Sequence, residues 1–289
     1  MDYLRLTRRA RAAKQPRGGY VNPRTMDVCY MSGAPAPLDH KGENVHASLV
    51  GLAVDYLTRY ALSALVSPGW ERAELAFSIS LIGAGLVGRE DYARGLCEFL
   101  NDELDQVNRR PEDPSIDYWV PSLSDPDTGE VYETIRVAVP STEAIDAAVK
   151  LASFDAAFRA GLAAYNPEAN TTPDASTAQH IATMIARSLA FFREYGPMTE
   201  AGFIAGDADG DFLTADTIWD FKVSVNPPTS VHTLQLLALW IMGTRGGRFA
   251  SITHLGIYNP RLDAVYRLPV ASIPAEVIAE VSGGDVIGF

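Results

Sequence analysis

The stretch that most constrains the fold of this chain is residues 203–242, in which two short alternating segments precede an apolar helix. Residues 203–213 alternate in polarity, with acidic side chains recurring on one face, and residues 218–223 alternate again after a polar four-residue turn. Alternation with a period of two, bounded by turn residues, predicts a β-hairpin. We expect this hairpin to close with Leu213 opposite Ile218.

This register concentrates charge on one face of the predicted hairpin. It places Asp211 opposite Asp220, and Asp209 opposite Lys222. Like charges directly opposite each other destabilise a sheet, and clustered carboxylates either raise their pKa values or bind a cation. Magnesium and manganese are the divalent cations that suit a site made only of oxygen atoms. The hairpin is therefore a candidate metal site, and the alternative is an ordinary solvated face.

Four short motifs occur along the chain. They are a glycine four residues before a histidine, a glycine three residues before an aspartate, an Asp-Phe-Lys triplet, and a glutamine that opens an apolar helix: Gly42-x-x-x-His46, Gly206-x-x-Asp209, Asp220-Phe221-Lys222 and Gln235. This ordered set resembles the PD-(D/E)XK nuclease superfamily and, more narrowly, its RecB-like branch. The resemblance covers residues 40–65 and 200–270.

The resemblance implies an α/β (α+β) fold with a restriction-endonuclease-like core, in which helices flank a mixed central sheet. It also implies a nuclease, either an exonuclease or an endonuclease, that hydrolyses phosphodiester bonds in DNA rather than RNA with Mg²⁺ or Mn²⁺. By this resemblance Asp209 and Asp220 would hold the metal, with His46 as a further ligand. Lys222 would orient or deprotonate the attacking water, and Gln235 would contact the lysine or the nucleic-acid backbone.

The abundance of acidic residues leaves two choices open. The carboxylates of this segment outnumber those that the motif needs, so Asp207 or Asp211 could replace Asp209 as the ligand. The formal net charge of −12 argues against a broad nucleic-acid-binding surface. The alternative function is a catalytically silent nuclease-like protein that acts through protein contacts, because a fold does not by itself determine activity.

A third hypothesis comes from a glycine pattern, Gly83-x-Gly85-x-x-Gly88, which matches a dinucleotide-binding fingerprint by letter. That site needs a buried strand before the glycines and a second strand that carries a ribose-binding acid. Residues 77–82 could form the first strand, but the residues after the glycines read as one helix. The structural alternative is close helix packing at the glycines.

The N-terminal residues 1–40 read as a basic, irregular arm. Residues 1–25 carry seven basic side chains and one acidic side chain. Such an arm can contact phosphates, remain disordered or pack on the acidic surface of its own protein. We expect residues 41–289 to form a single nuclease-like domain, in which residues 66–195 are a large, mostly helical insertion.

Composition sets the remaining limits. The chain has only two cysteines, which are too few for an iron–sulfur cluster and make a disulfide framework improbable. No apolar run is long enough to cross a bilayer, and the basic N-terminus lacks the apolar stretch of a secretory signal. We therefore expect a cytoplasmic protein whose partners are nucleic acid and other proteins rather than a membrane.

Overall fold

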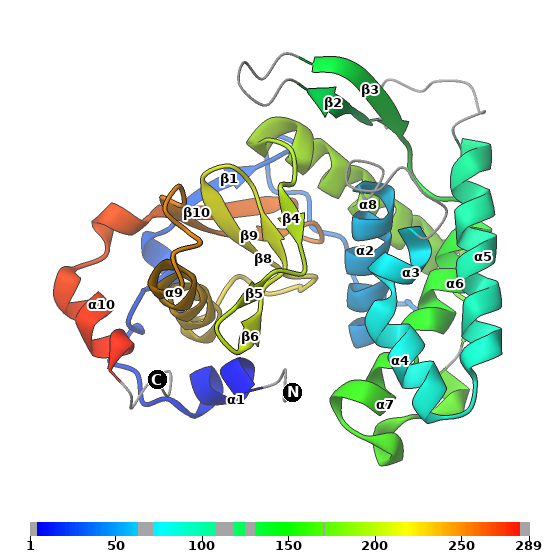
Figure 1. Cartoon of the computed structure of the whole chain (residues 1–289), viewed down its shortest axis with the longest axis horizontal. Helices are drawn as coiled ribbons and strands as arrows, with labels where there is room; N and C mark the ends of the chain where they lie inside the picture. The colour runs from blue at the N-terminus through cyan, green and yellow to red at the C-terminus, as the bar shows by residue number, and fades with distance from the viewer. Residues whose placement is uncertain (1–4, 63–71, 108–117, 125–130, 170, 284–289) are drawn as a thin grey trace. The chain divides into compact units, whose positions relative to one another are not determined.

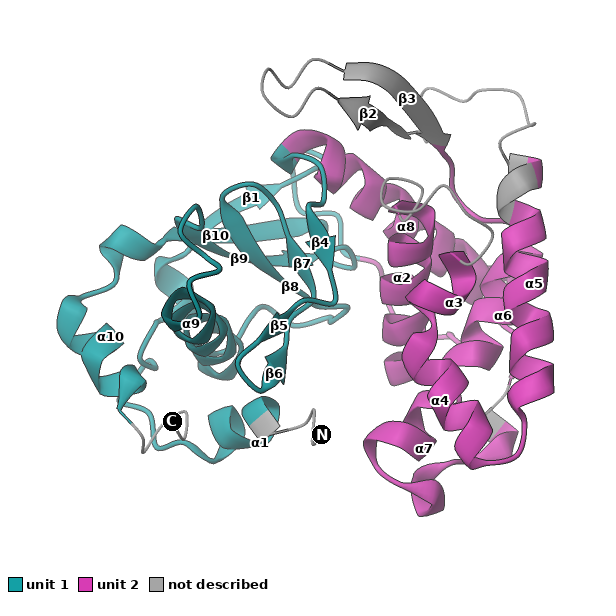
Figure 2. Cartoon of the chain, in the orientation of Figure 1, with its two compact units in different colours: residues 1–37, 195–289 teal, residues 38–194 magenta. Residues whose placement is uncertain are grey.

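The structure, a computed structural model, describes the whole chain apart from residues 1–4, 63–71, 108–117, 125–130, 170 and 284–289. It forms two compact units (Figure 2). Unit 1 comprises residues 1–37 and 195–289, and unit 2 comprises residues 38–194. These boundaries differ from the expected ones. The N-terminal segment belongs to the same unit as the hairpin, and His46 belongs to the same unit as most of the expected insertion.

Unit 1 is built on a mixed six-stranded sheet with the order β1-β10-β9-β8-β7-β4 (Figure 1). In chain order its strands are β1 (Asp27–Tyr30), β4 (Glu200–Ala201), β7 (Phe212–Leu213), β8 (Thr217–Phe221), β9 (His254–Asn259) and β10 (Ala264–Pro269). Neighbouring strands are antiparallel except β8 and β9, which are parallel and joined by helix α9 (Ser230–Arg245) as a crossover. The expected α+β fold with a mixed sheet flanked by helices is confirmed.

Helix α9 covers one face of this sheet because its apolar side chains recur at helical spacing. Leu234, Leu237 and Ile241 are buried in one hydrophobic cluster with Ile218 of β8 and Ile257 of β9. Helices α1 (Arg5–Ala12) and α10 (Ala275–Ser282) pack against α9, and the short turns η1 (Pro23–Thr25) and η5 (Val270–Ser272) connect the remaining parts. Each large apolar side chain buried here contributes about 1.5–3 kcal/mol to folding.

The predicted hairpin register is confirmed at the closed end of the hairpin, where Leu213 pairs with Ile218. The first strand of that hairpin is not continuous, however. Residues 204–209 form a separate two-stranded ribbon, β5 (Ile204–Ala205) with β6 (Ala208–Asp209). Asp209 therefore pairs with Ile204, and the expectation that it faces Lys222 across the hairpin is wrong.

Two glycines explain this break in the first strand. Gly206 adopts a φ of 62° in the turn of the β5–β6 ribbon, a conformation that favours glycine. At Gly210, the ring of Phe203 fills the space that a Cβ atom would occupy. The chain therefore folds back between Phe203 and Gly210, and only the last two residues before the turn rejoin the main sheet.

Parts of the basic N-terminal segment form regular structure, in α1, η1 and β1. Leu6 and Ala10 of α1 are buried in the α9 cluster, and β1 forms an edge strand paired with β10. Arg9 donates hydrogen bonds to both carboxylate oxygens of Asp207, at 3.0 and 3.1 Å. The arm was expected to contact phosphates, remain disordered or pack on the acidic surface of its own protein. The contact between Arg9 and Asp207 is an example of the third behaviour.

Unit 2 is mostly helical. Its elements are α2 (Ala47–Leu62), α3 (Arg72–Ala76), α4 (Ser78–Leu86), α5 (Glu90–Val107), α6 (Thr142–Ala152), α7 (Asp155–Arg159), most of α8 (Ala175–Tyr195), the turns η3 (Leu162–Ala164) and η4 (Pro167–Ala169), and a hairpin of β2 (Tyr118–Ser124) with β3 (Val131–Val137). A buried carboxylate links its helices, because Asp155 accepts hydrogen bonds from Tyr56 at 2.5 Å, Ser80 at 2.7 Å and Arg159 at 3.1 Å.

The glycine pattern at 83–88 has a structural explanation in unit 2. Residues 78–86 are helix α4, so the strand that a dinucleotide site needs before its glycines is not formed there. A Cβ atom at Gly83 would lie 2.1 Å from the backbone oxygen of Phe154. Gly83 therefore permits the close approach of α4 to the start of α7, which is the packing alternative.

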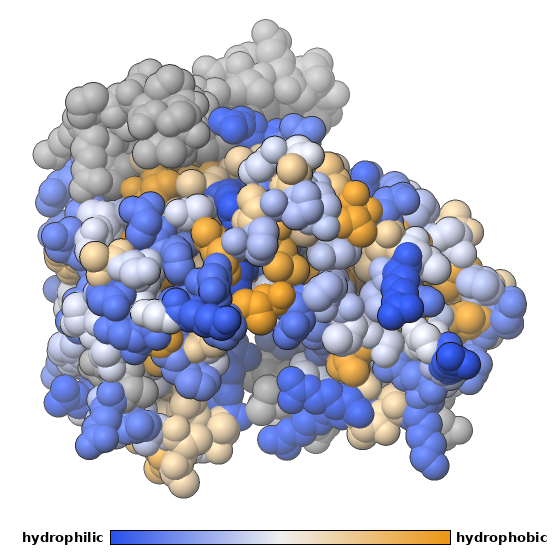
Figure 3. Space-filling view, turned by 180° about the vertical axis from the view of Figure 1, so that it is seen from behind, coloured by the Kyte–Doolittle hydropathy of each residue, from blue (hydrophilic) through white to orange (hydrophobic). Residues whose placement is uncertain are grey.

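Among the described residues, no helix combines the length and the apolar character needed to cross a membrane. The rear face drawn in Figure 3 is mostly hydrophilic, with hydrophobic side chains scattered among polar ones. Scattered apolar side chains of this kind are an ordinary surface feature and indicate no binding site by themselves.

Candidate functional site

A short ion pair lies at the end of β8. Asp220 is near the end of the strand and Lys222 follows two residues later, which is the spacing that keeps two side chains on one face. The Nζ atom of Lys222 donates a hydrogen bond to Oδ1 of Asp220 at 2.6 Å. The side chain of Lys222 is 29% exposed and that of Asp220 is 12% exposed. A pair that is charged, short and largely shielded from water is stronger than a surface ion pair.

Asp211 is the acidic residue of the first strand that the structure brings to this pair. Its Oδ2 atom accepts a hydrogen bond from the backbone N–H of Phe221 at 2.8 Å. Phe221 lies between Asp220 and Lys222 in the chain, so the Asp211 carboxylate is held at the peptide that follows Asp220. The sequence left Asp207, Asp209 and Asp211 open as ligands, and this geometry favours Asp211.

Asp207 and Asp209 lie on the β5–β6 ribbon and its turn instead. Asp207 is paired with Arg9 of α1. Asp209 is exposed and pairs with Ile204 in that ribbon. The alternation that suggested a continuous acidic face fails because the chain turns back at Gly206.

His232, in the first turn of α9, is a neighbour of Lys222 that the sequence did not assign to the site. Its Nδ1 atom accepts a hydrogen bond from the backbone N–H of Thr229 at 3.2 Å, as part of a capping box. Burial, together with the positive charges of Lys222 and Arg11, lowers the pKa of His232 to about 4. The capping position could have been recognised from sequence, whereas the proximity to Lys222 depends on the crossover from β8 to α9.

Gln235 lies one helical turn into α9 and interacts with the N-terminal helix. Its Nε2 atom donates a hydrogen bond to Oγ1 of Thr7 at 2.7 Å. The expected contact of Gln235 with Lys222 is not among the hydrogen bonds of the described residues. In this structure the glutamine joins α9 to α1.

His46 lies in unit 2, immediately before α2. Its Nδ1 atom is 2.7 Å from Oγ of Ser48 and accepts the backbone N–H of the same residue at 3.3 Å. This is the geometry of a side chain that caps a helix N-terminus. The role of His46 as a metal ligand stays a prediction.

The residues at the end of β8 fit a hard divalent cation by their chemistry. Within the ranges that the structure describes, no three His, Cys, Asp or Glu side chains are grouped so as to hold a metal ion. Magnesium, however, is usually bound through one or two carboxylates and keeps several waters. Asp220 provides one carboxylate, and Asp211, which accepts the N–H of the next residue, provides a second. By their chemistry these two carboxylates suit Mg²⁺ or Mn²⁺.

Comparisons of the chain with protein-family models, with curated proteins and with solved structures find no match.

Proposed function

We propose that the chain is a metal-dependent nuclease that hydrolyses phosphodiester bonds, with DNA as its substrate and a restriction-endonuclease-like core in unit 1. The observation that carries the proposal is the Asp220–Lys222 pair, with the Asp211 carboxylate held at the peptide between them. The chain path supports it, because a hairpin is followed by a glutamine-bearing helix and a parallel strand.

Each residue has a distinct role in this mechanism. Asp211 and Asp220 would hold Mg²⁺ or Mn²⁺, which lowers the pKa of a bound water and stabilises the negative charge of an in-line transition state. Lys222 orients the attacking water or a phosphate oxygen through its ammonium group, and Asp220 fixes the position of that group. His232 is neutral at pH 7 because of its low pKa, so it adds no second positive charge beside Lys222.

The test combines Mn²⁺ titration calorimetry with cleavage of a plasmid and of a single-stranded oligonucleotide. We expect Asp220→Asn and Asp211→Asn to lose both Mn²⁺ binding and cleavage. Lys222→Met keeps Mn²⁺ binding and lowers the cleavage rate by about 10²–10³-fold, the usual cost of removing one electrostatic donor from an active site. Asp27→Asn is the matched control, because it removes the same charge from an exposed position of β1, outside the site.

Two outcomes would contradict these assignments. If Asp209→Asn abolishes Mn²⁺ binding and Asp211→Asn does not, Asp209 is the ligand, as the motif resemblance implies. If the wild-type protein neither binds Mn²⁺ nor cleaves, the alternative holds and the chain is a silent nuclease-like protein that acts through protein contacts. The net charge of −12 is the observation that favours this alternative.

A further inference from the structure

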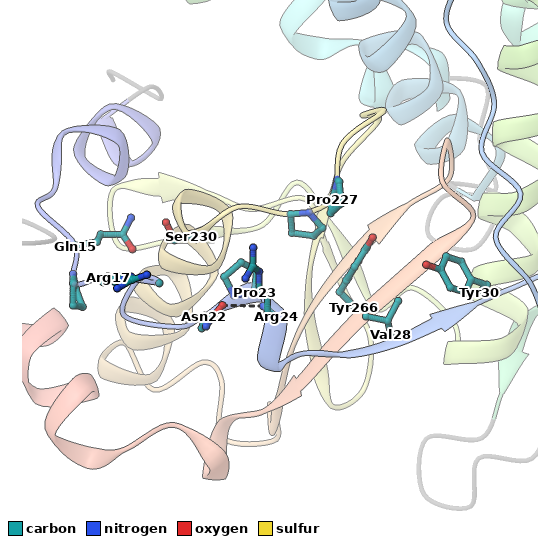
Figure 4. Close-up of a pocket in the computed structure, with 14 residues that line it drawn as sticks. Gln15, Arg17, Asn22, Pro23, Arg24, Val28, Tyr30, Pro227, Ser230 and Tyr266 are labelled. Carbon is teal, nitrogen blue, oxygen red and sulfur yellow. Dashed lines mark hydrogen bonds between the residues drawn. The ribbon is translucent and has the colours of Figure 1, made fainter.

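An open groove of about 1270 Å³ lies on unit 1 (Figure 4). Arg17 and Arg24, from the loop after α1, line one part of it. Tyr30 of β1 and Tyr266 of β10 line the sheet side, and the Pro227-Pro228 segment that leads from Lys222 into α9 lines another part. None of these residues belongs to the mechanism described above.

The register of the sheet connects this groove to the Asp220–Lys222 pair. Asp220 pairs with Ile257 of β9, and Ile257 pairs with Tyr266 of β10. Paired residues of neighbouring strands point to the same face, so Tyr266 lies on the face that carries Asp220. Adjacent strands are about 4.8 Å apart and one strand separates β8 from β10, so the groove begins about 10 Å from Asp220.

The groove is locally basic in an otherwise acidic protein. The side chains of Arg17 and Arg24 are exposed, and within the described residues neither forms an ion pair with a carboxylate. Two guanidinium groups without counter-charges, next to tyrosine rings, are complementary to phosphates and bases. The sheet side also carries Tyr30, which is only partly buried.

The loop that presents the two arginines is held against the start of α9. Gly19 has a φ of 89°, and a Cβ atom there would lie 2.4 Å from Cβ of Ser230, so only glycine permits this approach. The hydroxyl of Thr233 donates a hydrogen bond to the backbone oxygen of Val21 at 2.6 Å. The side chain of Asn22 accepts the backbone N–H of Arg24 at 3.0 Å. A loop fixed in this way loses little entropy when it binds a ligand.

We propose that this groove binds a single-stranded segment of nucleic acid, with Arg17 and Arg24 on its phosphates and Tyr30 stacked on a base. The proposal rests on the proposed function and defines the substrate as a strand that is single-stranded next to the cleaved bond. Pockets for single small ligands usually measure about 300–1,000 Å³, and the groove exceeds that range, so it has room for more than one nucleotide. Grooves that bind single strands combine basic side chains with aromatic stacking platforms.

The test measures binding without cleavage, by fluorescence anisotropy of a labelled oligothymidine of about twelve nucleotides in EDTA at several salt concentrations. The double variant Arg17→Gln/Arg24→Gln should weaken binding about tenfold or more at low salt. It should also reduce the slope of log K against log[salt] by about 1.4, since each phosphate contact on a single strand contributes about 0.7. The matched control is Arg8→Gln/Arg245→Gln, which removes two exposed charges of unit 1 outside the groove.

Variants of Tyr30 test base stacking separately from the contacts between arginine and phosphate. Tyr30→Leu should weaken oligothymidine binding and leave the salt slope unaltered, and Tyr30→Phe should retain wild-type affinity. Equal weakening by the groove and control double variants would overturn the proposal, as would equal affinity for a duplex of the same length. If the groove variant cleaves at the wild-type rate, the groove is not the substrate-binding site, and the proposed nuclease function is unaffected. If the oligonucleotide binds in the groove but the wild-type protein cleaves nothing, the nuclease function is wrong, and the groove remains a binding site.

Discussion

At the scale of single residues, the electrostatics of the candidate site centre on Lys222. Asp220 accepts its hydrogen bond and stabilises the ammonium group. His232 has the opposite relation to it, because burial first, and then the charges of Lys222 and Arg11, lower the pKa of the imidazole. The histidine accepts the N–H of Thr229 at Nδ1, so its proton resides on Nε2. The neutral imidazole therefore caps α9 without competing with Lys222 for Asp220.

The low pKa of His232 makes the stability of unit 1 depend on pH. The pKa of this group is about 4 in the folded protein and 6.5 in its ordinary state. Between these values the unfolded chain binds the additional proton, so stability is present above pH 6.5 and is lost as the pH falls towards 4. We expect His232→Gln, which keeps an acceptor for the N–H of Thr229, to lose less stability between pH 7 and about pH 4.5.

Urea unfolding midpoints at the two pH values measure this effect. His40→Gln serves as the control, because it removes an exposed histidine of unit 2. A His232→Gln variant whose midpoint falls with pH as steeply as that of the wild type would show that the imidazole is not held neutral by its neighbours.

At the scale of elements, the turn of the hairpin could be predicted and the path of its first strand could not. The four residues between Leu213 and Ile218 fix the register locally, and the pairing is as expected. The expected pairing of Asp209 with Lys222 required residues 203–213 to form one continuous strand. The chain instead reverses at Gly206 and pairs Ile204 with Asp209, and a pattern of period two does not show this turn.

The N-terminal segment shows the same limit at longer range. Strand β1 is short and reads as irregular, because it forms by pairing with β10, more than two hundred residues away. Four of the eight residues of helix α1 are arginine, and Leu6 and Ala10 are buried in the α9 cluster. The groove that includes Arg17 and Arg24 could not be predicted for this reason, since its walls come together only through those non-local contacts.

Packing between α4 and α7 gives a test at this scale. Gly83→Ala should destabilise unit 2 by about 1–3 kcal/mol, because the new methyl group would lie against the backbone oxygen of Phe154. Gly85→Ala in the same helix has its nearest neighbour at 3.8 Å, so it should be neutral or stabilising by up to about 1 kcal/mol from helix propensity. Denaturant unfolding of both variants measures the difference, and equal free energies would contradict the close approach at Gly83.

At the scale of the whole molecule, the chain builds unit 1 from two separate segments with unit 2 inserted between them. Composition does not mark the boundary between residues 37 and 38. Helix α8 continues through the other boundary, between residues 194 and 195. Its last residue, Tyr195, packs edge-on against Trp219 with the ring centres 5.5 Å apart. The expectation of one domain followed from the motifs, which occur in both units. The structure instead divides the hairpin motifs from the helix that carries His46.

Two compact units predict two thermal unfolding transitions rather than one, because all-or-none behaviour is a property of single domains. A pair of glycine variants can assign them. In unit 1, Gly256 pairs with Trp219, and a Cβ atom there would lie 2.2 Å from the indole ring. Gly256→Ala should lower one transition in scanning calorimetry by about 2–8 °C and leave the other in place. Gly83→Ala should lower the other transition alone. A single transition that both variants shift together would show that the two units unfold as one cooperative body, and the division into units would then describe contacts without describing stability.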